Sequence, residues 1–214
     1  MARRDHSLDI RITAAAFEEF SEKGYAGASL RKIAEKAGAT VGAIQIRYKS
    51  KDELFVSLLK PFLSEIEAAF QSIRSDYYSG ADEGIPARLR ASIQRESAVI
   101  LHLLFDHYDE AVLLLYQSAG SSLEGFFDTL VARKIEESAA FFRSTGYAGV
   151  DEQLLGLVIS AQFDSYRRII AGCRDRETAE HCMNALMVYH FGGWTALFDA
   201  ENHTKQESKN KNEV

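Results

Sequence analysis

The stretch "AGATVGAIQIRYKSKDEL", residues 37–54, decides the fold of this chain. Its first half consists mainly of small residues, in which Gly38 is suited to end one helix and Thr40 to begin the next. Its second half gathers long polar side chains, namely Gln45, Arg47, Tyr48, Lys49 and Lys51. The stretch therefore predicts two short helices joined by a tight turn, the arrangement of a helix-turn-helix.

The pattern outside this stretch is also helical. Proline occurs only at positions 61 and 86, and strand-like alternation between turn signals is nearly absent. Because an α/β fold would need such punctuation, we expect an all-α fold of about nine helices. The expected ranges are 7–22, 30–37, 41–48, 51–78 with a kink at Pro61, 87–104, 106–119, 121–144, 151–172 and 176–198.

The charge of the chain is distributed unevenly. The 214 residues carry a net charge of −6. Residues 1–51 hold ten Lys or Arg against six Asp or Glu, whereas the remaining 163 hold 15 against 25. A basic first segment on an acidic body suggests that only the first segment meets a polyanion.

Several classes of protein are disfavoured by composition. The chain lacks the apolar segment of a secretory signal and any apolar run long enough to cross a bilayer, so we expect a cytoplasmic location and no membrane partner. Its two cysteines, Cys173 and Cys182, lack the spacing of a zinc site and are expected to be buried free thiols, although a helical hairpin can bring them close. We expect no cofactor and no metal.

The segment 12–55 resembles the DNA-binding domain of the TetR/AcrR family of transcriptional regulators. The residues that carry the resemblance are Phe20, Gly24, Tyr25, Ile33, Ala34, Ala37, Gly38, Gly42, Ile44, Lys51, Glu53 and Leu54. The rest of the chain has only the helical character and length of the family. The resemblance implies a DNA-binding domain over 1–51 and an effector-binding and dimerisation domain over 52–200. The polar composition of 201–214 predicts a disordered tail.

Side-chain chemistry assigns separate roles on the DNA. The small residues Val41, Gly42 and Ala43 allow the third helix to approach the major groove, where Gln45 can pair with adenine or another base. Arg31 on the second helix can reach guanine, a role that the resemblance favours over a solvated face. Phosphates are the expected partners of Ser29, Thr40, Arg47, Tyr48 and Lys51.

Two of these positions depart from the family pattern, and others have alternative roles. The family usually carries an aromatic residue at Gln45 and often Tyr or His at Arg47, which suggests an altered operator preference. Tyr48 can instead pack mainly in the core. Arg3 and Arg4 can form a minor-groove arm or a disordered end.

The body is expected to provide the dimer interface. The last two long helices are apolar on more than one face, and the resemblance implies that they form a four-helix bundle with a second copy. The expected interface residues are Leu154, Val158, Ala161, Ser165, Met187, His190 and Trp194. Such a homodimer places two recognition helices on palindromic double-stranded DNA.

Polar residues in apolar surroundings are candidates for a site that binds a small effector. They are His102, Tyr116, Gln117, Phe127, Gln162, Asp164 and Tyr166. Alternatives remain: His102 can be a core histidine, the phenylalanines can be packing, and Asp164 can pair with Arg167 or Arg168. The resemblance implies a repressor that leaves its DNA when a small, largely apolar molecule binds. The helix that contains Pro61 is expected to transmit this signal from the effector-binding domain to the DNA-binding domain.

Other classes of function fit the sequence less well than a DNA-binding regulator. A helical di-iron enzyme needs Glu-x-x-His motifs, which are absent, and no nucleophile elbow or phosphate loop occurs, so we expect no catalytic residues. The cluster "DHYDE" at 106–110 can bind a metal but reads more simply as a charged helix start. A DNA-binding regulator that answers to a protein partner, or to no ligand, is the main alternative.

Overall fold

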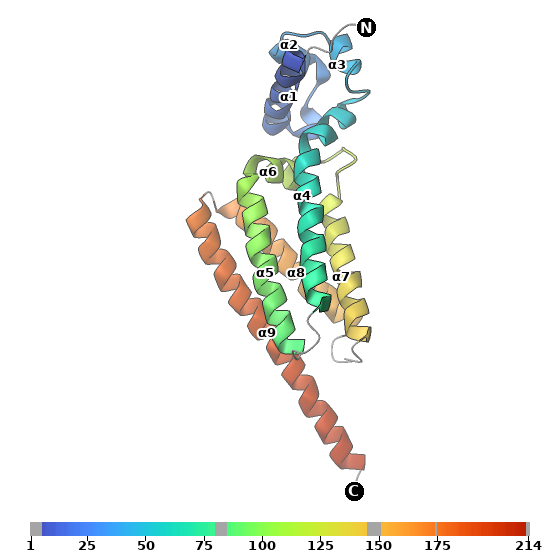
Figure 1. The fold of residues 1–214 in the computed structure, drawn as a ribbon, viewed down its shortest axis with the longest axis vertical. Coiled ribbons are helices and arrows are strands. Elements are labelled where there is room, and N and C mark those ends of the chain that lie inside the picture. The colour runs from blue at the N-terminus through green and yellow to red at the C-terminus, as the bar shows by residue number, and fades with distance from the viewer. Residues whose placement is uncertain (1–5, 80–84, 145–150, 174, 213–214) are drawn as a thin grey trace. The chain divides into compact units, whose positions relative to one another are not determined.

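The structure is a computed structural model that describes residues 6–79, 85–144, 151–173 and 175–212. Side chains are described at 6–74, 94–144, 151–173 and 175–197. The described residues form helices α1 to α9 and no strand, which confirms the all-α fold (Figure 1). The chain divides into two compact units, of which unit 1 comprises residues 1–67 and 107–127 and unit 2 comprises 68–106 and 128–214.

Unit 1 contains the predicted helix-turn-helix. Its elements are α1 (His6–Gly27), α2 (Leu30–Ala37), α3 (Val41–Gln45), the first part of α4 (Lys51–Ser79) and α6 (Tyr108–Tyr116). Helix α1 packs against both α2 and α6, and α2 packs against α3. Unit 1 therefore combines the DNA-binding segment with a helix from much later in the sequence.

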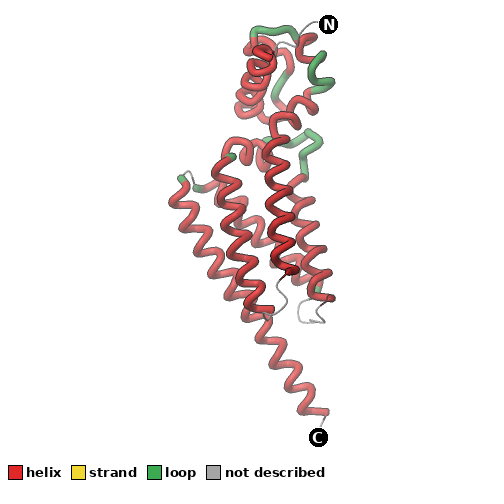
Figure 2. The backbone as a smooth tube through the Cα atoms, viewed as in Figure 1, coloured by secondary structure: helices red, strands yellow, loops and turns green. Residues whose placement is uncertain are grey.

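Unit 2 is a bundle of longer helices (Figure 2). It contains the second part of α4, α5 (Ile85–Asp106), most of α7 (Phe126–Ser144), α8 (Glu152–Gly172) and α9 (Arg176–Asn212). Helix α9 packs against α5 and α8. The chain passes between the units after residues 67, 106 and 127, so α4 is one of three covalent connections rather than the only one.

Each unit has its own apolar core. In unit 1, Ile12, Ile33, Ile44 and Phe55 are fully buried, so that α1, α2, α3 and α4 each contribute an anchor. In unit 2, the side chains of Leu155, Ile159, Phe163, Ile170, Met183 and Trp194 are almost fully buried. These residues recur at helical spacing, which explains why the helical pattern was visible in the sequence.

The observed helix ends differ from the expected ones at several places. Helix α3 ends at Gln45. Helix α7 begins only at Phe126, because the segment before α7 forms turns in which Gly120 and Gly125 have positive φ. Helix α9 continues to Asn212, so residues 201–212 are helical where composition suggested disorder. This tail contains good helix formers such as Lys, Glu and Gln, which extend a helix that has already started.

Gly24 produces a break inside α1. Its backbone has φ 66° and ψ 168°, a combination that glycine adopts far more easily than other residues. The break turns the amide of Tyr25 toward the carbonyl of Gln117, which accepts its hydrogen bond at 2.8 Å. A glycine is thus required where α1 meets the end of α6.

Substitution of Gly24 tests this requirement. We expect Gly24→Ala to lower the free energy of unfolding by about 1–3 kcal/mol, because the side chain strains the backbone at positive φ. Gly27→Ala is the matched control, since Gly27 has no positive φ and an added methyl group there meets the Cβ of Lys23 at 3.4 Å. Urea unfolding of both variants measures the difference, and equal stability of the two would contradict the account.

Candidate DNA-binding surface and interior polar network

The helix-turn-helix is fixed by local hydrogen bonds. The Ser29 hydroxyl accepts from the Lys32 amide at 3.2 Å, and the Thr40 hydroxyl accepts from the Ala43 amide at 3.1 Å. Gly38 lies between the two helices with φ 61°, and its amide caps the end of α2. Ser29 and Thr40, which were expected to contact phosphates, therefore act as N-caps in the structure.

The candidate base-reading residues lie on the surface. Arg31, Thr40, Gly42 and Gln45 are exposed, while Val41, Ala43 and Tyr48 are half-buried. Ile44 is fully buried and holds α3 against the core. The exposed face of α3 thus presents a residue without a side chain, Gly42, beside an amide, Gln45, as a groove-reading helix requires.

Sequence reasoning missed one residue of this surface. Ile46 directly follows α3, and 86% of its side chain is exposed. It stands between the polar residues Gln45 and Arg47 in the sequence, and this was the available signal. An exposed isoleucine beside Gln45 is suited to contact the methyl group of thymine.

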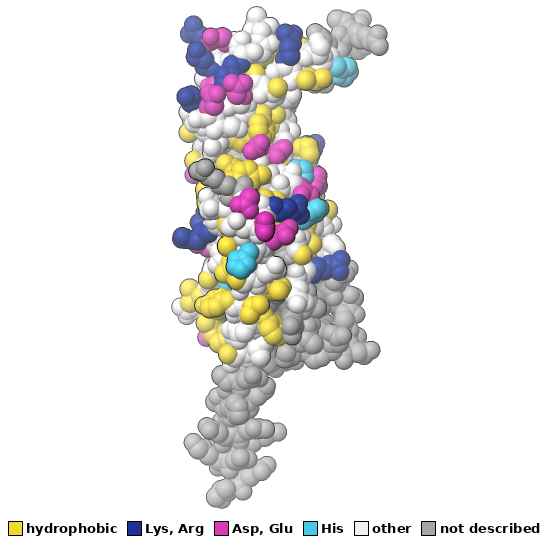
Figure 3. Space-filling model, turned by 90° about the vertical axis from the view of Figure 1, so that its left-hand side faces the viewer, with side chains coloured by type: hydrophobic (Ala, Val, Ile, Leu, Met, Phe, Trp, Pro, Cys, Tyr) yellow, Lys and Arg dark blue, Asp and Glu magenta, His cyan; other side chains and the backbone are white. Residues whose placement is uncertain are grey.

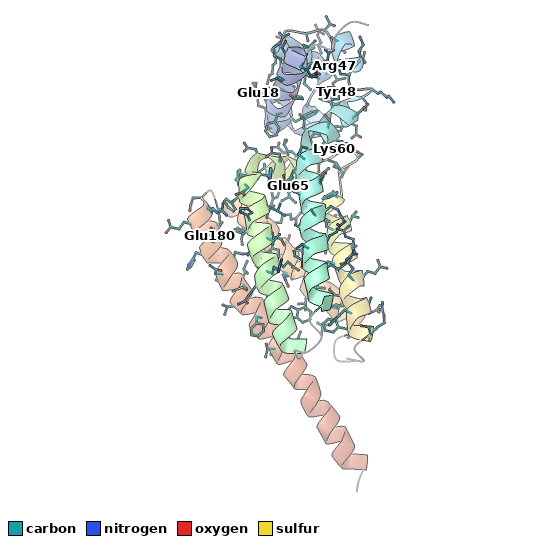
Figure 4. The ribbon with its side chains drawn as sticks, in the orientation of Figure 1. Glu18, Arg47, Tyr48, Lys60, Glu65 and Glu180 are labelled. Atoms are coloured by element: carbon teal, nitrogen blue, oxygen red, sulfur yellow. The ribbon has the colours of Figure 1, made fainter. Side chains whose placement is uncertain are left out.

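Arg47 is engaged within unit 1. Its guanidinium forms an ion pair with Asp9 of α1 and donates to the Ala43 carbonyl at 3.1 Å, and only 13% of its side chain is exposed. Figure 4 shows Arg47 and Tyr48 at the end of the helix-turn-helix. Arg47 therefore fastens the end of α3 to α1, a role that the sequence did not indicate because Asp9 is far away in the chain.

Lys51 is also engaged internally. Its ammonium group donates to the carbonyls of Tyr25, at 2.7 Å, and Ala28, at 3.0 Å, and lies 4.3 Å from the centre of the Tyr25 ring. These contacts join the start of α4 to the segment that leads into α2. A phosphate contact by Lys51 would compete with them.

Acidic side chains neutralise another cation of the head. Lys36 lies 3.0 Å from a carboxylate oxygen of Glu18, 3.4 Å from one of Glu19 and 3.2 Å from one of Glu22. The hydrogen bond with Glu18, supported by the other two, raises the pKa of Lys36 despite partial desolvation. Lys36 is thus held on α1, whereas Arg31 and Lys49 are exposed and form no ion pair within the described part of the chain.

Unit 2 contains a buried polar network that three of its helices supply. On α5, the Glu96 carboxylate accepts from Lys134 of α7 at 2.5 Å and from the amide of Gln162 of α8 at 3.2 Å. Gln162 also donates to the Tyr166 hydroxyl at 2.7 Å, and this hydroxyl lies 3.2 Å from that of Ser97. Burial, together with the negative charge of Glu96, raises the pKa of Tyr166, so its hydroxyl stays protonated at neutral pH.

His190 of α9 adds a further polar group to the interior of unit 2. It is 6% exposed, and its Nε2 atom has no hydrogen-bond partner among the described residues. Burial lowers the pKa of His190, although the charge of Glu96 acts in the opposite direction. The imidazole is therefore neutral at neutral pH.

The structure groups only some of the candidate effector-binding residues. Gln162 and Tyr166 share the buried network, which Glu96, Ser97 and Lys134 complete without having been identified from the sequence. Asp164 instead pairs with Arg167 at 2.7 Å and with Arg168 at 2.6 Å, which confirms the simpler alternative. Hydrogen bonds from Arg168 and then Arg167 lower the pKa of Asp164.

The other candidates have different surroundings. Tyr116, Gln117 and Phe127 belong to unit 1, where Tyr116 is 44% exposed. The His102 side chain is 66% exposed and pairs with Asp106 at 3.0 Å, so it is not a core histidine. Sequence reasoning failed here because "VILHLLF" looked uniformly apolar, while His102 faces the outer side of its helix.

The cluster "DHYDE" forms the start of α6. Asp109 and Glu110 lie in its first turn, where acidic residues stabilise a helix. His107 pairs with Glu65 at 2.9 Å and its ring lies 5.3 Å from that of Phe62. Within the described residues no three His, Cys, Asp or Glu side chains form a metal-binding group.

The expected dimer residues divide between the surface and the core. Ala161 is exposed, and Leu154, Val158, Ser165 and Met187 are half-buried. His190 and Trp194 are only 6% and 3% exposed, so they belong to the interior of unit 2 rather than to its surface. They were expected at the interface because the last helix is apolar on more than one face, but α9 packs against α5 and α8 within the same chain.

Other apolar residues of the last two helices are exposed instead. They are Leu157 of α8, at 64%, and Val188 and Tyr189 of α9, at 68% and 74%. Gly156, Gly192 and Gly193 leave open space where a Cβ atom would lie. Hydrophobic side chains gather on the side of unit 2 that α9 occupies (Figure 3). No helix in the described part of the chain is both long and apolar enough to span a membrane.

Comparison with known proteins agrees with this geometry. Residues 12–58 match the model of the bacterial regulatory proteins of the tetR family. The HTH-type transcriptional regulator RutR of Escherichia coli strain K12 is 27% identical over 156 residues, which are 72% of this chain and 71% of RutR.

Solved structures show the same fold at low sequence identity. A TetR-like transcriptional regulator from Rhodococcus sp. RHA1 aligns with a TM-score of 0.61 and 21% identity over 90% of this chain and all of that one. FadR from Bacillus subtilis, solved in complex with stearoyl-CoA, aligns with a TM-score of 0.55 and 17% identity over 84% of this chain and 97% of that one.

The helix-turn-helix geometry and the match over the same residues define the class of this protein: it is a helix-turn-helix, DNA-binding transcriptional regulator. Its helical body has the fold of the same group of regulators. Its residues 12–58 form a DNA-binding domain of the tetR family of bacterial regulatory proteins.

The contrast between Lys51 and Arg31 can be tested by mutation. We expect Lys51→Ala to lower the free energy of unfolding by about 1–3 kcal/mol, because two backbone carbonyls lose their donor. Arg31→Ala should leave stability unchanged and weaken binding to an operator. Urea unfolding and fluorescence anisotropy with DNA measure the two effects, and a stable Lys51→Ala protein with weakened DNA binding would instead support a phosphate contact.

Proposed function

We propose that this regulator is a repressor that binds a palindromic operator as a homodimer and leaves it when a small, largely apolar molecule binds. The observation that carries the DNA-binding part is the capped helix-turn-helix with Arg31, Gln45 and Ile46 on its exposed side. Gln45 and Ile46 offer an amide for adenine and an apolar group for thymine, while Arg31 suits guanine. Such a protein acts where the DNA is, which supports a cytoplasmic location.

The exposed apolar face of α8 and α9 supports the homodimer. Leu157, Val188 and Tyr189 are large apolar side chains that a monomer would leave in water. The glycines beside them permit close approach of another backbone. A two-fold axis through this face would give each operator half-site its own α3, with the half-sites about one helical turn, or a multiple of it, apart.

The buried network of unit 2 supports the effector. Gln162 and Tyr166 are the two candidates from the sequence that lie in it, surrounded by apolar and aromatic side chains such as Phe163. An apolar interior with a few directed polar groups is the usual form of a small-molecule site. The stearoyl-CoA in the FadR structure shows that this fold can hold a largely apolar ligand in another protein.

Contacts of α6 support a route from effector to DNA. Three contacts attach α6 and its flanking residues to the rest of unit 1: Tyr25 to Gln117, the Ser122 amide to Asp52 at 2.8 Å, and His107 to Glu65. The chain enters α6 from α5 and leaves it into α7, both of which carry network residues. The effector releases the DNA only if it binds two conformations of the dimer, which differ in the spacing of the DNA-binding domains, with different affinity.

Selection of bound duplexes from a random DNA pool tests the proposal. We expect an enriched sequence with two inverted half-sites, because the dimer presents two equivalent recognition helices. Tyr189→Glu places a charge on the proposed interface, so it should yield monomers in sedimentation and weaken operator binding at least tenfold or so.

Ala132→Glu is the matched control for that variant. Ala132 is exposed on α7 and receives the same added charge, so the dimer and its operator affinity should persist. Failure of the pool to enrich any sequence would refute specific DNA binding. Enrichment of a single unsymmetrical site, with Tyr189→Glu still dimeric, would refute the proposed interface.

A further inference from the structure

Lys134 and Glu96, the ion pair of the buried network, differ in how much of each side chain is exposed. The Glu96 side chain is 3% exposed, whereas that of Lys134 is 21% exposed. Lys134 therefore reaches the network from the margin of the bundle, and its flexible stem allows the ammonium group to turn outward into water. Glu96 has no such freedom and needs a positive or hydrogen-donating partner inside the protein.

We propose that the effector is an organic cation, with an ammonium or related group that takes the place of Lys134 at Glu96. This inference rests on the effector binding proposed above and specifies its chemistry. The exchange keeps one positive charge beside the buried carboxylate, so its desolvation remains compensated. An anionic effector would instead place a second negative charge next to Glu96.

The aromatic side chains next to the buried network suit the remainder of such a molecule. Phe163 lies 5.7 Å from the Tyr166 ring and 6.2 Å from that of Phe70, measured between ring centres. Aromatic faces attract cations and also cover the apolar part of a ligand. The hydroxyl groups of Ser97 and Tyr166 and the unpartnered Nε2 of His190 offer further hydrogen bonds in the same unit.

Three probes of similar shape separate the possible charges. Phenethylamine carries an ammonium group, phenethyl alcohol is neutral, and hydrocinnamate carries a carboxylate. We expect only the amine to raise the melting temperature of the dimer and to change the fluorescence of Trp194, the single tryptophan, which is buried in unit 2. No response to the amine, or an equal or larger response to either other probe, would overturn the proposal.

Variants identify the site of the response. Glu96→Gln should weaken amine binding at least about tenfold, because the buried charge is lost. Glu136→Gln, an exposed position on α7, is the matched control and should bind as the parent does. Lys134→Met should strengthen amine binding, since no internal ammonium has to leave, and weaker binding in this variant would overturn the exchange.

Operator binding is measured in parallel on the same preparations. A protein that binds its operator but ignores the amine refutes the ligand class alone. A protein that binds the amine through Glu96 but no operator refutes the proposed regulation alone. The two proposals can therefore fail separately.

An independent observation concerns the two cysteines. The Sγ atoms of Cys173, at the end of α8, and Cys182, in α9, are 4.0 Å apart. Both are free thiols, with Cys173 buried and Cys182 half-buried. A disulfide needs the sulfurs to approach to about 2 Å, which is a small movement for side chains already in contact.

We infer that Cys173 and Cys182 are an oxidisable dithiol that cross-links α8 to α9 when a peroxide acts on it. The more accessible Cys182 thiolate attacks a peroxide oxygen, and its sulfenic acid then reacts with Cys173, whose proton leaves with the hydroxide. In total, two thiols and hydrogen peroxide give one disulfide and two waters. Burial, with the neighbouring Cys182 and Asp175, raises the pKa of the Cys173 thiol, which disfavours Cys173 as the first thiol to react with the peroxide.

Treatment of the folded dimer with hydrogen peroxide tests the dithiol. We expect loss of both titratable thiols, a mass decrease of two hydrogen atoms per chain, and reversal by dithiothreitol. The chain has only these two cysteines, so the product is unambiguous. Cys173→Ser should instead accumulate a sulfenic acid that reacts with dimedone. Retention of both thiols, added oxygen in the parent protein, or a cross-link between chains would overturn the inference.

Discussion

The hydrogen bond from the Tyr25 amide to the Gln117 carbonyl is the contact on which the arrangement of unit 1 depends. It forms because Gly24 adopts a backbone conformation that turns α1 at this point. The carbonyl of the same Tyr25 accepts from Lys51, so both polar groups of one peptide residue are fixed by other segments. These contacts also fix where α2 and α3 begin, because Ala28 and Ser29 connect the end of α1 to α2.

Local features of the fold could be predicted from the sequence, whereas long-range pairings could not. The caps of α2 and α3 depend on residues three positions apart, and Thr40 was identified from the sequence as the start of a helix. The roles of Arg47 and Lys51 depend on Asp9 and Tyr25, which no local pattern connects to them. A basic residue next to a recognition helix therefore looked like a phosphate contact before its partner was known. The same reason hid Glu96 and Lys134, which lie on different helices.

These pairings hold three cations of the described DNA-binding segment within unit 1. Lys36, Arg47 and Lys51 are held by carboxylates or carbonyls of unit 1, whereas Arg31 and Lys49 remain exposed. The affinity of a DNA-binding protein for phosphates, and its salt dependence, scale with the number of cations that reach the backbone. Each cation that is held internally contributes less to nonspecific attraction, so base contacts and, in the proposed dimer, the second DNA-binding segment supply a larger share of the affinity.

The buried ion pair of unit 2 is not explained by stability. Replacing such a pair with apolar residues of similar volume is often neutral or stabilising, because desolvation of two charges offsets their attraction. The network nevertheless joins α5, α7 and α8 around Glu96. A ligand that takes over this carboxylate releases Lys134, so binding changes the contacts of α7 without adding a buried charge. Because α6 lies between α5 and α7 in the chain, a change at these helices can bias the hydrogen bond that Gln117 accepts from Tyr25.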